Sequence, residues 1–438
     1  MEGHHHLQPR ARLPMATLCV LMWTLAGCAI LDSREGLEGV SGPYFGDAVS
    51  IVGNGALIGS PGGADGISPG LAYIFGRTSD GWIQRAALSA EGGKPGNEFG
   101  SAVAFAETTA LVGAWNTDAV APVSGSAYVF EHGPTGWGQA AVLVNPDAGE
   151  RHLLGESVAL DRSTAVVGAP GVNMKLWSDT TTTVPAWSGA VYVWSRDQTG
   201  WRYQTRITPD SQRLPADPAA QTRPYHLWEA FGRTVAIYGD CLVVGAQNGT
   251  TRPGAVYVFR RVSGTWKQEA RLEQPQTSFG IKIAVSNGTI AVASAGSVFV
   301  FAHANGDWLL QAKIQPHVAG EDAGFEYGGP VSIDGNLIVV GSIRYKKRKG
   351  AAFVFERVGA DWKQVAMITA KDTQPDSLFG RSVSIHGGEI VVGASFHDSK
   401  GPNYGAAYVF RREESRWLQT SKLVARIPTD SRTGVKGQ

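Results

Sequence analysis

The sequence predicts an all-β fold, a seven-bladed β-propeller of four-stranded antiparallel blades. Three observations lead to this prediction: seven copies of one pattern, short strand-forming runs within each copy, and turn residues between the runs. Each copy opens with an aromatic–Gly pair or a variant of it. An apolar strand, a Gly/Asn/Asp turn, a Val-Gly-Ala-like run, a Gly-x-x-Tyr-Val-Phe-like run, a polar turn and a Trp follow. A repeat of about 50 residues made of short strands is typical of propellers.

The copies can be placed by their first and last landmarks. The pairs begin at Phe45, Phe99, Leu154, Phe231, Phe279, Tyr327 and Phe379. The tryptophans are Trp82, Trp137, Trp201, Trp266, Trp308, Trp362 and Trp417. Because the Trp recurs in every copy, we expect it to pack between blades rather than bind a ligand.

We assign residues 45–427 to the propeller and 428–438 to a C-terminal tail. Almost no strand-forming sequence precedes Phe45. The ring must therefore close through the last strand of repeat seven or by simple abutment of blades, and the sequence leaves both open.

The four strands of a repeat have distinct patterns. In repeat six, Asp334-Gly335-Asn336 lies between two apolar runs and predicts a tight hairpin between the first and second strands. The second strand is continuously apolar, as in residues 390–394, which predicts burial on both faces. Its Gly-Ala end suits crowding near the propeller axis. The third strand alternates, as in residues 406–410, and the Trp begins the fourth, as in residues 417–423.

The N-terminus has the layout of an export signal. Arg10 and Arg12 precede an apolar run, residues 13–26, that is too short to span a bilayer. We therefore predict that residues 1–27 are a signal peptide and that residues 28–44 are a short tether.

The end of that signal resembles the lipobox of bacterial lipoproteins, because Leu25 and the small residues Ala26 and Gly27 precede Cys28. This resemblance implies cleavage before Cys28 and acylation of its thiol and new amine, and several acyl chains anchor a protein stably. Ala29, rather than Asp, favours the outer membrane by the same resemblance. The alternative is an ordinary signal peptide with an incidental Cys.

Composition excludes some classes of function. The formal net charge of the 438 residues is +1, which gives no global field that would favour nucleic acid. The three cysteines, Cys19, Cys28 and Cys241, provide no disulfide framework. Cys241 opens an apolar strand, where we expect a small buried side chain.

The repeats resemble the FG-GAP repeat family, whose best-known members form the propeller of integrin α chains. The first motif of the family is present at the five Phe–Gly pairs, and the second is complete at Gly168-Ala169-Pro170. The resemblance implies a propeller and points to bacterial lipoproteins with such repeats as relatives.

Many members of that family bind calcium in Asp-x-Asp-x-Asp-Gly loops between the second and third strands. Calcium needs six to eight oxygen ligands, usually with several carboxylates. The corresponding loops here hold at most one or two carboxylates, at Asp65, Asp118, Asp179 and Asp398. We therefore expect no calcium site, no other metal and no cofactor.

Length variation is concentrated on one face of the predicted propeller, and long loops on a rigid scaffold commonly carry function. Two insertions belong to adjacent blades, residues 171–188 and 209–230. Their aromatic side chains are candidates for binding a partner or a sugar. The candidates are Trp177, Trp187, Tyr225, His226 and Trp228. The alternative is that these side chains pack their own loops onto the propeller.

A basic loop occupies the same position in repeat six. Its five cations are candidates for binding phosphate, acidic polysaccharide or anionic headgroups. They are Arg344, Lys346, Lys347, Arg348 and Lys349. The alternative is a solvated loop whose charges stay in water.

The sequence contains no catalytic motif, and the neighbouring His397-Asp398 is only weak evidence for an acid–base pair. We therefore predict a non-enzymatic binding or adhesion module in the cell envelope, with a protein or glycan ligand. A polysaccharide hydrolase or lyase with an axial site stays open, because its acids could come from different blades. A structural component of an envelope assembly also stays open.

Overall fold

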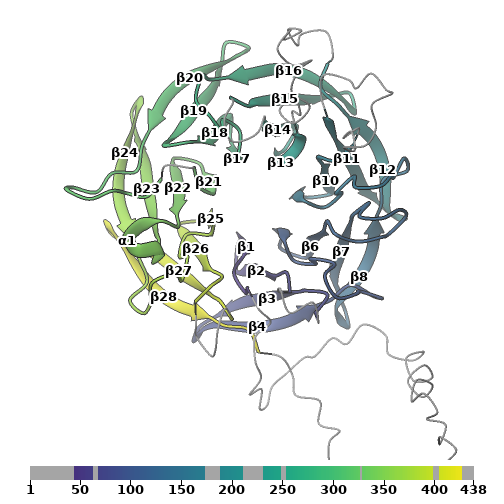
Figure 1. The fold of residues 1–438 in the computed structure, drawn as a ribbon, viewed down its shortest axis with the longest axis horizontal. Coiled ribbons are helices and arrows are strands. Elements are labelled where there is room, and N and C mark those ends of the chain that lie inside the picture. The colour runs from purple at the N-terminus through teal and green to yellow at the C-terminus, as the bar shows by residue number, and fades with distance from the viewer. Residues whose placement is uncertain are drawn as a thin grey trace, which may run out of the picture.

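The computed structural model describes residues 44–62, 68–172, 188–210, 230–247, 253–325, 328–397 and 404–426. Within these residues the fold is all-β, with 28 strands and one short helix. Four consecutive strands form a meander, called here a unit and numbered as the sequence repeats. The units stand around a common axis, with the first strand of each nearest the centre and the fourth outermost (Figure 1). This arrangement confirms the propeller-like architecture.

The strands are grouped here by their place in the unit. The first strands are β1 (Ala48–Val52), β5 (Ala102–Ala106), β9 (Ser157–Asp161), β13 (Ala230–Tyr238), β17 (Lys282–Ser286), β21 (Val331–Asp334) and β25 (Ser382–His386). The second are β2 (Gly55–Ser60), β6 (Thr109–Ala114), β10 (Thr164–Ala169), β14 (Cys241–Gln247), β18 (Thr289–Ser294), β22 (Leu337–Ser342) and β26 (Glu389–Ala394). The third are β3 (Leu71–Thr78), β7 (Ser126–Gly133), β11 (Ser188–Asp197), β15 (Ala255–Val262), β19 (Ser297–Ala304), β23 (Ala351–Val358) and β27 (Ala406–Glu413). The fourth are β4 (Gly81–Leu88), β8 (Gly136–Leu143), β12 (Gly200–Ile207), β16 (Thr265–Glu273), β20 (Asp307–Ile314), β24 (Asp361–Ile368) and β28 (Arg416–Leu423).

Pairing within each unit is antiparallel between consecutive strands, as the hairpin signals predict. Five units are separate four-stranded sheets in the described residues, whereas β9–β12 and β13–β16 are joined into one eight-stranded sheet. The junction is short, because β11 and β13 pair in parallel only at Ser188 with Ala230 and at Gly189 with Phe231.

The second strands are buried except at the first residue of β2 and of β22, as their continuous apolar sequence predicts. Strands β6 and β26 are buried at every residue. The Gly near the end of these strands lies against the next unit. A Cβ built on Gly59 would lie 2.0 Å from the carbonyl oxygen of Gly100, and one on Gly168 would lie 1.9 Å from that of Gly232. Close approach of neighbouring backbones therefore requires glycine here, with repeat five, which carries Ala293, as the exception.

Aromatic residues form the core of each unit and of the junctions. Phe99 is fully buried and meets Tyr128 and Phe130 of its own unit edge-on. Trp137 packs in a cluster with Leu57 of the preceding unit. The prediction that the recurring Trp packs between units is confirmed at this junction and at others of the same kind.

The ring closes by abutment of its first and last units. Among the described residues no strand of β1–β4 pairs with β25–β28. Side chains from β1–β3 and β26–β28 share one apolar cluster. The Ser382 hydroxyl donates to the Gly46 carbonyl at 2.8 Å, and the Gln84 side-chain amide donates to the Arg426 carbonyl at 2.8 Å. These contacts resolve the two modes of closure that the sequence leaves open.

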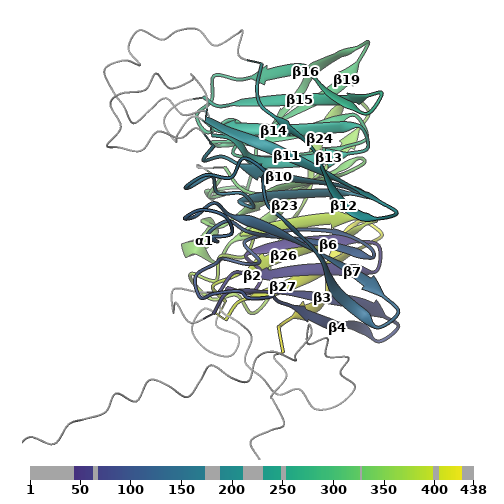
Figure 2. The ribbon, with the colours of Figure 1, turned by 90° about the vertical axis from the view of Figure 1, so that its right-hand side faces the viewer.

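The two faces of the ring differ as predicted. The short helix α1 (Tyr345–Arg348) projects from one face, and the hairpin turns between third and fourth strands lie on the other (Figure 2). We call these the loop-rich face and the short-turn face. The loops after the second strands and the connections into the next unit lie on the loop-rich face.

Cys241 is buried at the start of β14, as expected, and burial raises the pKa of its thiol to about 11.

Candidate binding face and axial mouth

Several sequence candidates lie outside the described residues. These are the five aromatic side chains, Trp177, Trp187, Tyr225, His226 and Trp228, and the lipobox with Cys28. Their roles stay predictions.

The described residues that flank the two insertions lie together. The Gly189 amide donates to the Val172 carbonyl at 2.6 Å, so the first insertion leaves and re-enters the fold at one point. Ser188, the last residue of that insertion, pairs with Ala230, the last residue of the second. The two insertions therefore end next to each other on the loop-rich face.

The basic loop is an ordered turn rather than a free segment. Its backbone carbonyls accept hydrogen bonds from the segment that leads into unit seven: Lys347 from Asp376, Arg348 from Leu378. Lys346 and Lys347 have positive φ angles of 45° and 56°, a strained conformation for these residue types that the bonded carbonyls help to maintain.

Carboxylates neutralise part of the positive charge of this loop. Lys346 Nζ lies 3.2 Å from Glu321, and Arg348 lies 3.2 Å from Asp376. In the part of the chain that the structure describes, Lys347 and Lys349 have no ion-pair partner. These two side chains are therefore the cations of the loop best placed to meet an anion.

His397 does not form an exposed acid–base pair, because it is buried and Asp398 lies outside the described residues. Its Nδ1 lies 3.2 Å from the Ser377 hydroxyl, and its Nε2 lies 2.9 Å from Lys422 Nζ and 3.6 Å from Asp372. Ser, His and Asp thus line up, but the Ser377 side chain is only 1% exposed and cannot meet a substrate. The cluster holds the loops of unit seven together.

Charged side chains gather around the axis on the loop-rich face, and we call them the axial mouth. They follow the aromatic–Gly pairs at the start of the first strands. The axial mouth comprises Asp47, Glu156, Arg233, Lys282 and Arg381. The Arg381 guanidinium donates to Asp47 at 2.9 Å, and Arg233 lies 3.1 Å from Glu156. Each of these ion pairs joins two adjacent units.

Lys282 is the cation of the axial mouth without an ion-pair partner among the described residues. Its side chain is exposed, although protein atoms surround it, because it faces the opening along the axis. This confinement lowers the pKa of Lys282, and the guanidiniums of Arg381 and Arg233 lower it further, whereas Asp47 and Glu156 raise it. An anion that entered here would gain a cation that is already partly desolvated.

A second carboxyl group lies near Asp47. Glu98 precedes the aromatic–Gly pair of unit two, and its pKa is raised by burial first and by the charge of Asp47 second. Two acidic groups with different environments are therefore brought close together from adjacent units.

The described residues contain no group of three or more His, Cys, Asp or Glu side chains that could hold a metal ion. Asp118 instead accepts a hydrogen bond from the Val123 amide at 2.8 Å.

Sequence reasoning missed the axial mouth because its members come from five different repeats. A signal was present in the alignment of the repeats. The residue after the aromatic–Gly pair is polar in five copies, at Asp47, Ser101, Glu156, Arg233 and Arg381, although the strand that follows is mostly apolar.

Comparison with known proteins establishes the family. The profile of the FG-GAP repeat family matches residues 37–75, 82–130, 137–194, 229–259 and 362–410, together more than half of the chain. The protein therefore belongs to the FG-GAP repeat family, as the aromatic–Gly and Gly-Ala-Pro motifs predict. No curated protein is similar enough in sequence to match.

Solved structures share the fold at low sequence identity. A protein from Lactobacillus plantarum is similar with a TM-score of 0.53 at 11% identity, over 82% of this chain and 93% of that one. A protein from Bacteroides fragilis, named provisionally as a 6-phosphogluconolactonase, is similar with a TM-score of 0.52 at 10% identity, over 89% of this chain and 95% of that one. These similarities concern the fold alone.

Proposed function

We propose that this protein is a cell-envelope lipoprotein whose seven units are the blades of a propeller that binds a ligand without catalysis. The loop-rich face would engage an anionic glycan or a protein. The axial mouth carries this proposal, because it offers Lys282 beside two ion pairs, on the same face as the insertions and the basic loop. A rigid ring that gathers charges from several units is suited to bind and orient a ligand.

Anchoring is the second part of the proposal. In the described part of the chain no helix is long and apolar enough to cross a membrane. We propose that acyl chains on Cys28 attach the protein to the outer membrane and that residues 28–44 connect them to the propeller. Labelling with a radioactive or alkyne fatty acid tests this, since a Cys28→Ser variant should lose the label.

Binding can be tested with a glycan array and an envelope extract, with and without calcium. The first variant replaces residues 173–187 by a short Gly-Ser linker, which the 2.6 Å contact between Val172 and Gly189 allows. The second is Lys282→Gln, and its control is Lys267→Gln on an exposed outer strand. We expect an acidic glycan or a protein to be retained by the wild type, and retention to fall in the first two variants but not in the control.

Retention that is equal in all variants would contradict a binding site on the loop-rich face. Retention that needs calcium would contradict the expectation of a metal-independent site.

A hydrolase or lyase with an axial site is the second candidate. Glu98 and Asp47 favour it, because a pair of carboxyl groups, one of them with a raised pKa, is the usual arrangement of an acid and a base in glycoside cleavage. The provisional name of the Bacteroides fragilis protein is consistent with enzymatic members of this fold. Turnover of an acidic polysaccharide that is lost in Glu98→Gln would favour this function over binding alone.

A further inference from the structure

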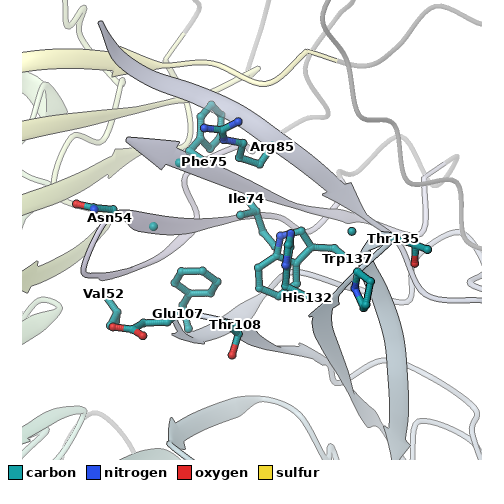
Figure 3. Close-up of a pocket in the computed structure, with 15 residues that line it drawn as sticks. Val52, Asn54, Ile74, Phe75, Arg85, Glu107, Thr108, His132, Thr135 and Trp137 are labelled. Atoms are coloured by element: carbon teal, nitrogen blue, oxygen red, sulfur yellow. The ribbon is translucent and has the colours of Figure 1, made fainter. Parts of the chain in front are cut away.

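A groove of about 820 Å³ lies on the short-turn face between units one and two (Figure 3). Its walls come from β1–β4 on one side and from β5, β7 and β8 on the other. The volume is in the range of small-molecule sites. The groove is distant in the fold from the loop-rich face, so a role for it is independent of the proposed function.

Equivalent junctions show what normally fills this place. At the junction of units two and three, Glu131 of β7 accepts a hydrogen bond from the indole N–H of Trp201 at 2.8 Å and a second bond from Arg196 at 2.9 Å. The acceptor comes from the preceding unit and the donors from the following one. A carboxylate thus occupies the junction.

Other junctions use the fourth strand to supply the acceptor. Glu269 of β16 accepts from the Trp308 indole at 3.4 Å and lies 3.3 Å from His303 Nε2. Gln311 of β20 accepts from the Trp362 indole at 3.1 Å. The two acceptor positions lie on paired strands of one unit, the third and the fourth. In unit four, Arg260 occupies the repeat position of Glu131 and donates to Glu269 at 3.1 Å.

The donors are kept at the junction of units one and two, but the acceptor is missing. His132 and Trp137 are the counterparts of His303 and Trp308, and their rings lie 5.4 Å apart, much like the 5.0 Å of the other pair. In the repeat of unit one, Gly76 occupies the position equivalent to Glu131, and Arg85 occupies the position equivalent to Glu269. In the described residues, neither the Trp137 indole nor the Arg85 guanidinium has a hydrogen-bond acceptor.

The absence of a side chain at Gly76 also opens the groove. A Cβ built on Gly76 would meet first Arg85 Nε, at 2.8 Å. Arg85 is exposed, so its head group is free to turn toward a ligand. An imidazole, an indole N–H and a guanidinium therefore line one groove, at a junction whose counterparts between units two and three and between units four and five hold a carboxylate (Figure 3).

We propose that this groove binds a small sugar acid, whose carboxylate takes the place of the missing glutamate. His132 and Trp137 would contact the carboxylate, as their counterparts contact Glu131 and Glu269. Arg85 would pair with it as Arg260 pairs with Glu269 in unit four. Glu107, Thr108 and Thr135 also line the groove and provide acceptors and hydroxyl groups for the sugar hydroxyls. Glu107 lies apart from Trp137 in the groove (Figure 3). The end near Trp137 would therefore take the carboxylate of the ligand, and the end near Glu107 would take its hydroxyl groups.

The proposal can be tested by calorimetric titration of the whole mature protein with D-glucuronate, D-glucose and succinate. We expect glucuronate to bind and glucose, which lacks the carboxylate, not to bind. Succinate that binds as tightly as glucuronate would overturn the sugar part of the proposal. Absence of glucuronate binding at millimolar concentration would overturn it as a whole.

The decisive variant is Gly76→Glu, which supplies the missing carboxylate from the protein itself. Gly76 has no positive φ angle, and the nearest obstacle is a flexible side chain, so the fold accepts the change. We expect glucuronate binding to be lost in Gly76→Glu and largely kept in Gly76→Ala. Glucuronate binding that survives in Gly76→Glu would place the ligand elsewhere and contradict the proposal.

Arg85→Gln provides a second variant on an exposed strand position. The loss of a charge-assisted hydrogen bond should weaken glucuronate binding by about tenfold or more. Lys267→Gln, on the outer strand of unit four, is the matched control and should bind like the wild type. Equal affinity of Arg85→Gln and the control would contradict the assigned role of the guanidinium.

Discussion

At the scale of single residues, Glu131 shows how a partly buried carboxylate holds two units together. It accepts hydrogen bonds from Arg196 and from the Trp201 indole, both in the next unit. The hydrogen bond from Arg196 is the main cause that lowers the pKa of Glu131 below its ordinary value of 4.5, and Trp201 adds to it. The ionised form is therefore favoured by folding.

We predict that Glu131→Gln lowers stability near neutral pH by about 1 kcal/mol, since Arg196 is partly exposed and water screens the pair. A lowered pKa in the folded state gives stability that is present above the ordinary pKa and is lost as the pH falls below it. The difference in thermal midpoint between wild type and variant should thus shrink between about pH 5 and pH 3. Thermal unfolding over this range measures it.

Glu413→Gln, at an exposed strand end, is the control and should change the midpoint little at any pH. A difference between wild type and Glu131→Gln that grows on acidification would show that the carboxylate does not act through its ionised form.

At the scale of elements, the repeats made most strands predictable because each strand has a local signal. The Asp334-Gly335-Asn336 turn lies between β21 and β22, as predicted. The charged groups of the axial mouth had no local signal of this kind within a single repeat. Lys282, Arg233 and Asp47 are far apart in the chain and meet only because the ring places the starts of all first strands around one axis.

The same limit explains the groove. Neither Gly76 nor Arg85 is unusual in its own strand, and only comparison with Glu131 and Glu269 at equivalent positions reveals the missing acceptor. Pairing between units depends on residues about one repeat apart, which the pattern of a single repeat does not specify.

The basic loop is an element whose order depends on contacts with its neighbours. The Tyr345 hydroxyl donates to Glu321 at 2.7 Å, and Lys346 lies 3.2 Å from the same carboxylate. Glu321 belongs to the connection from unit five into unit six. One carboxylate therefore fixes the start of the loop.

We predict that Glu321→Gln increases amide hydrogen exchange in residues 344–350 by about two- to tenfold, the range expected for the loss of one hydrogen bond. The global thermal midpoint should stay unchanged, because the Glu321 side chain is exposed and water can replace its contacts. Hydrogen exchange with mass spectrometry measures both this segment and the rest of the chain. Asp361→Asn, on the short-turn face, is the control, and unchanged exchange in Glu321→Gln would show that backbone contacts alone order the loop.

At the scale of the whole molecule, the closing junction has the same construction as an internal one. At the junction of units three and four, the Ser157 hydroxyl donates to the Gly232 carbonyl at 2.7 Å. At the closing junction, the Ser382 hydroxyl donates to the Gly46 carbonyl at 2.8 Å. A ring that closes by abutment should therefore be as sensitive to damage at its closing junction as at the internal one.

We predict that Gly168→Ala and Gly393→Ala lower the thermal midpoint by the same amount, about 2–5 °C, because each overpacks one junction. The added Cβ would meet the carbonyl oxygen of the next unit at 1.9 Å in both cases, so the two changes are matched in geometry. Gly138→Ala, which meets no atom within 4 Å, is the control. Scanning calorimetry of the three variants measures the effect. A neutral Gly393→Ala beside a destabilising Gly168→Ala would mean that the ring is open between units one and seven in solution, whereas equal losses require the first and last units to abut as tightly as any other pair.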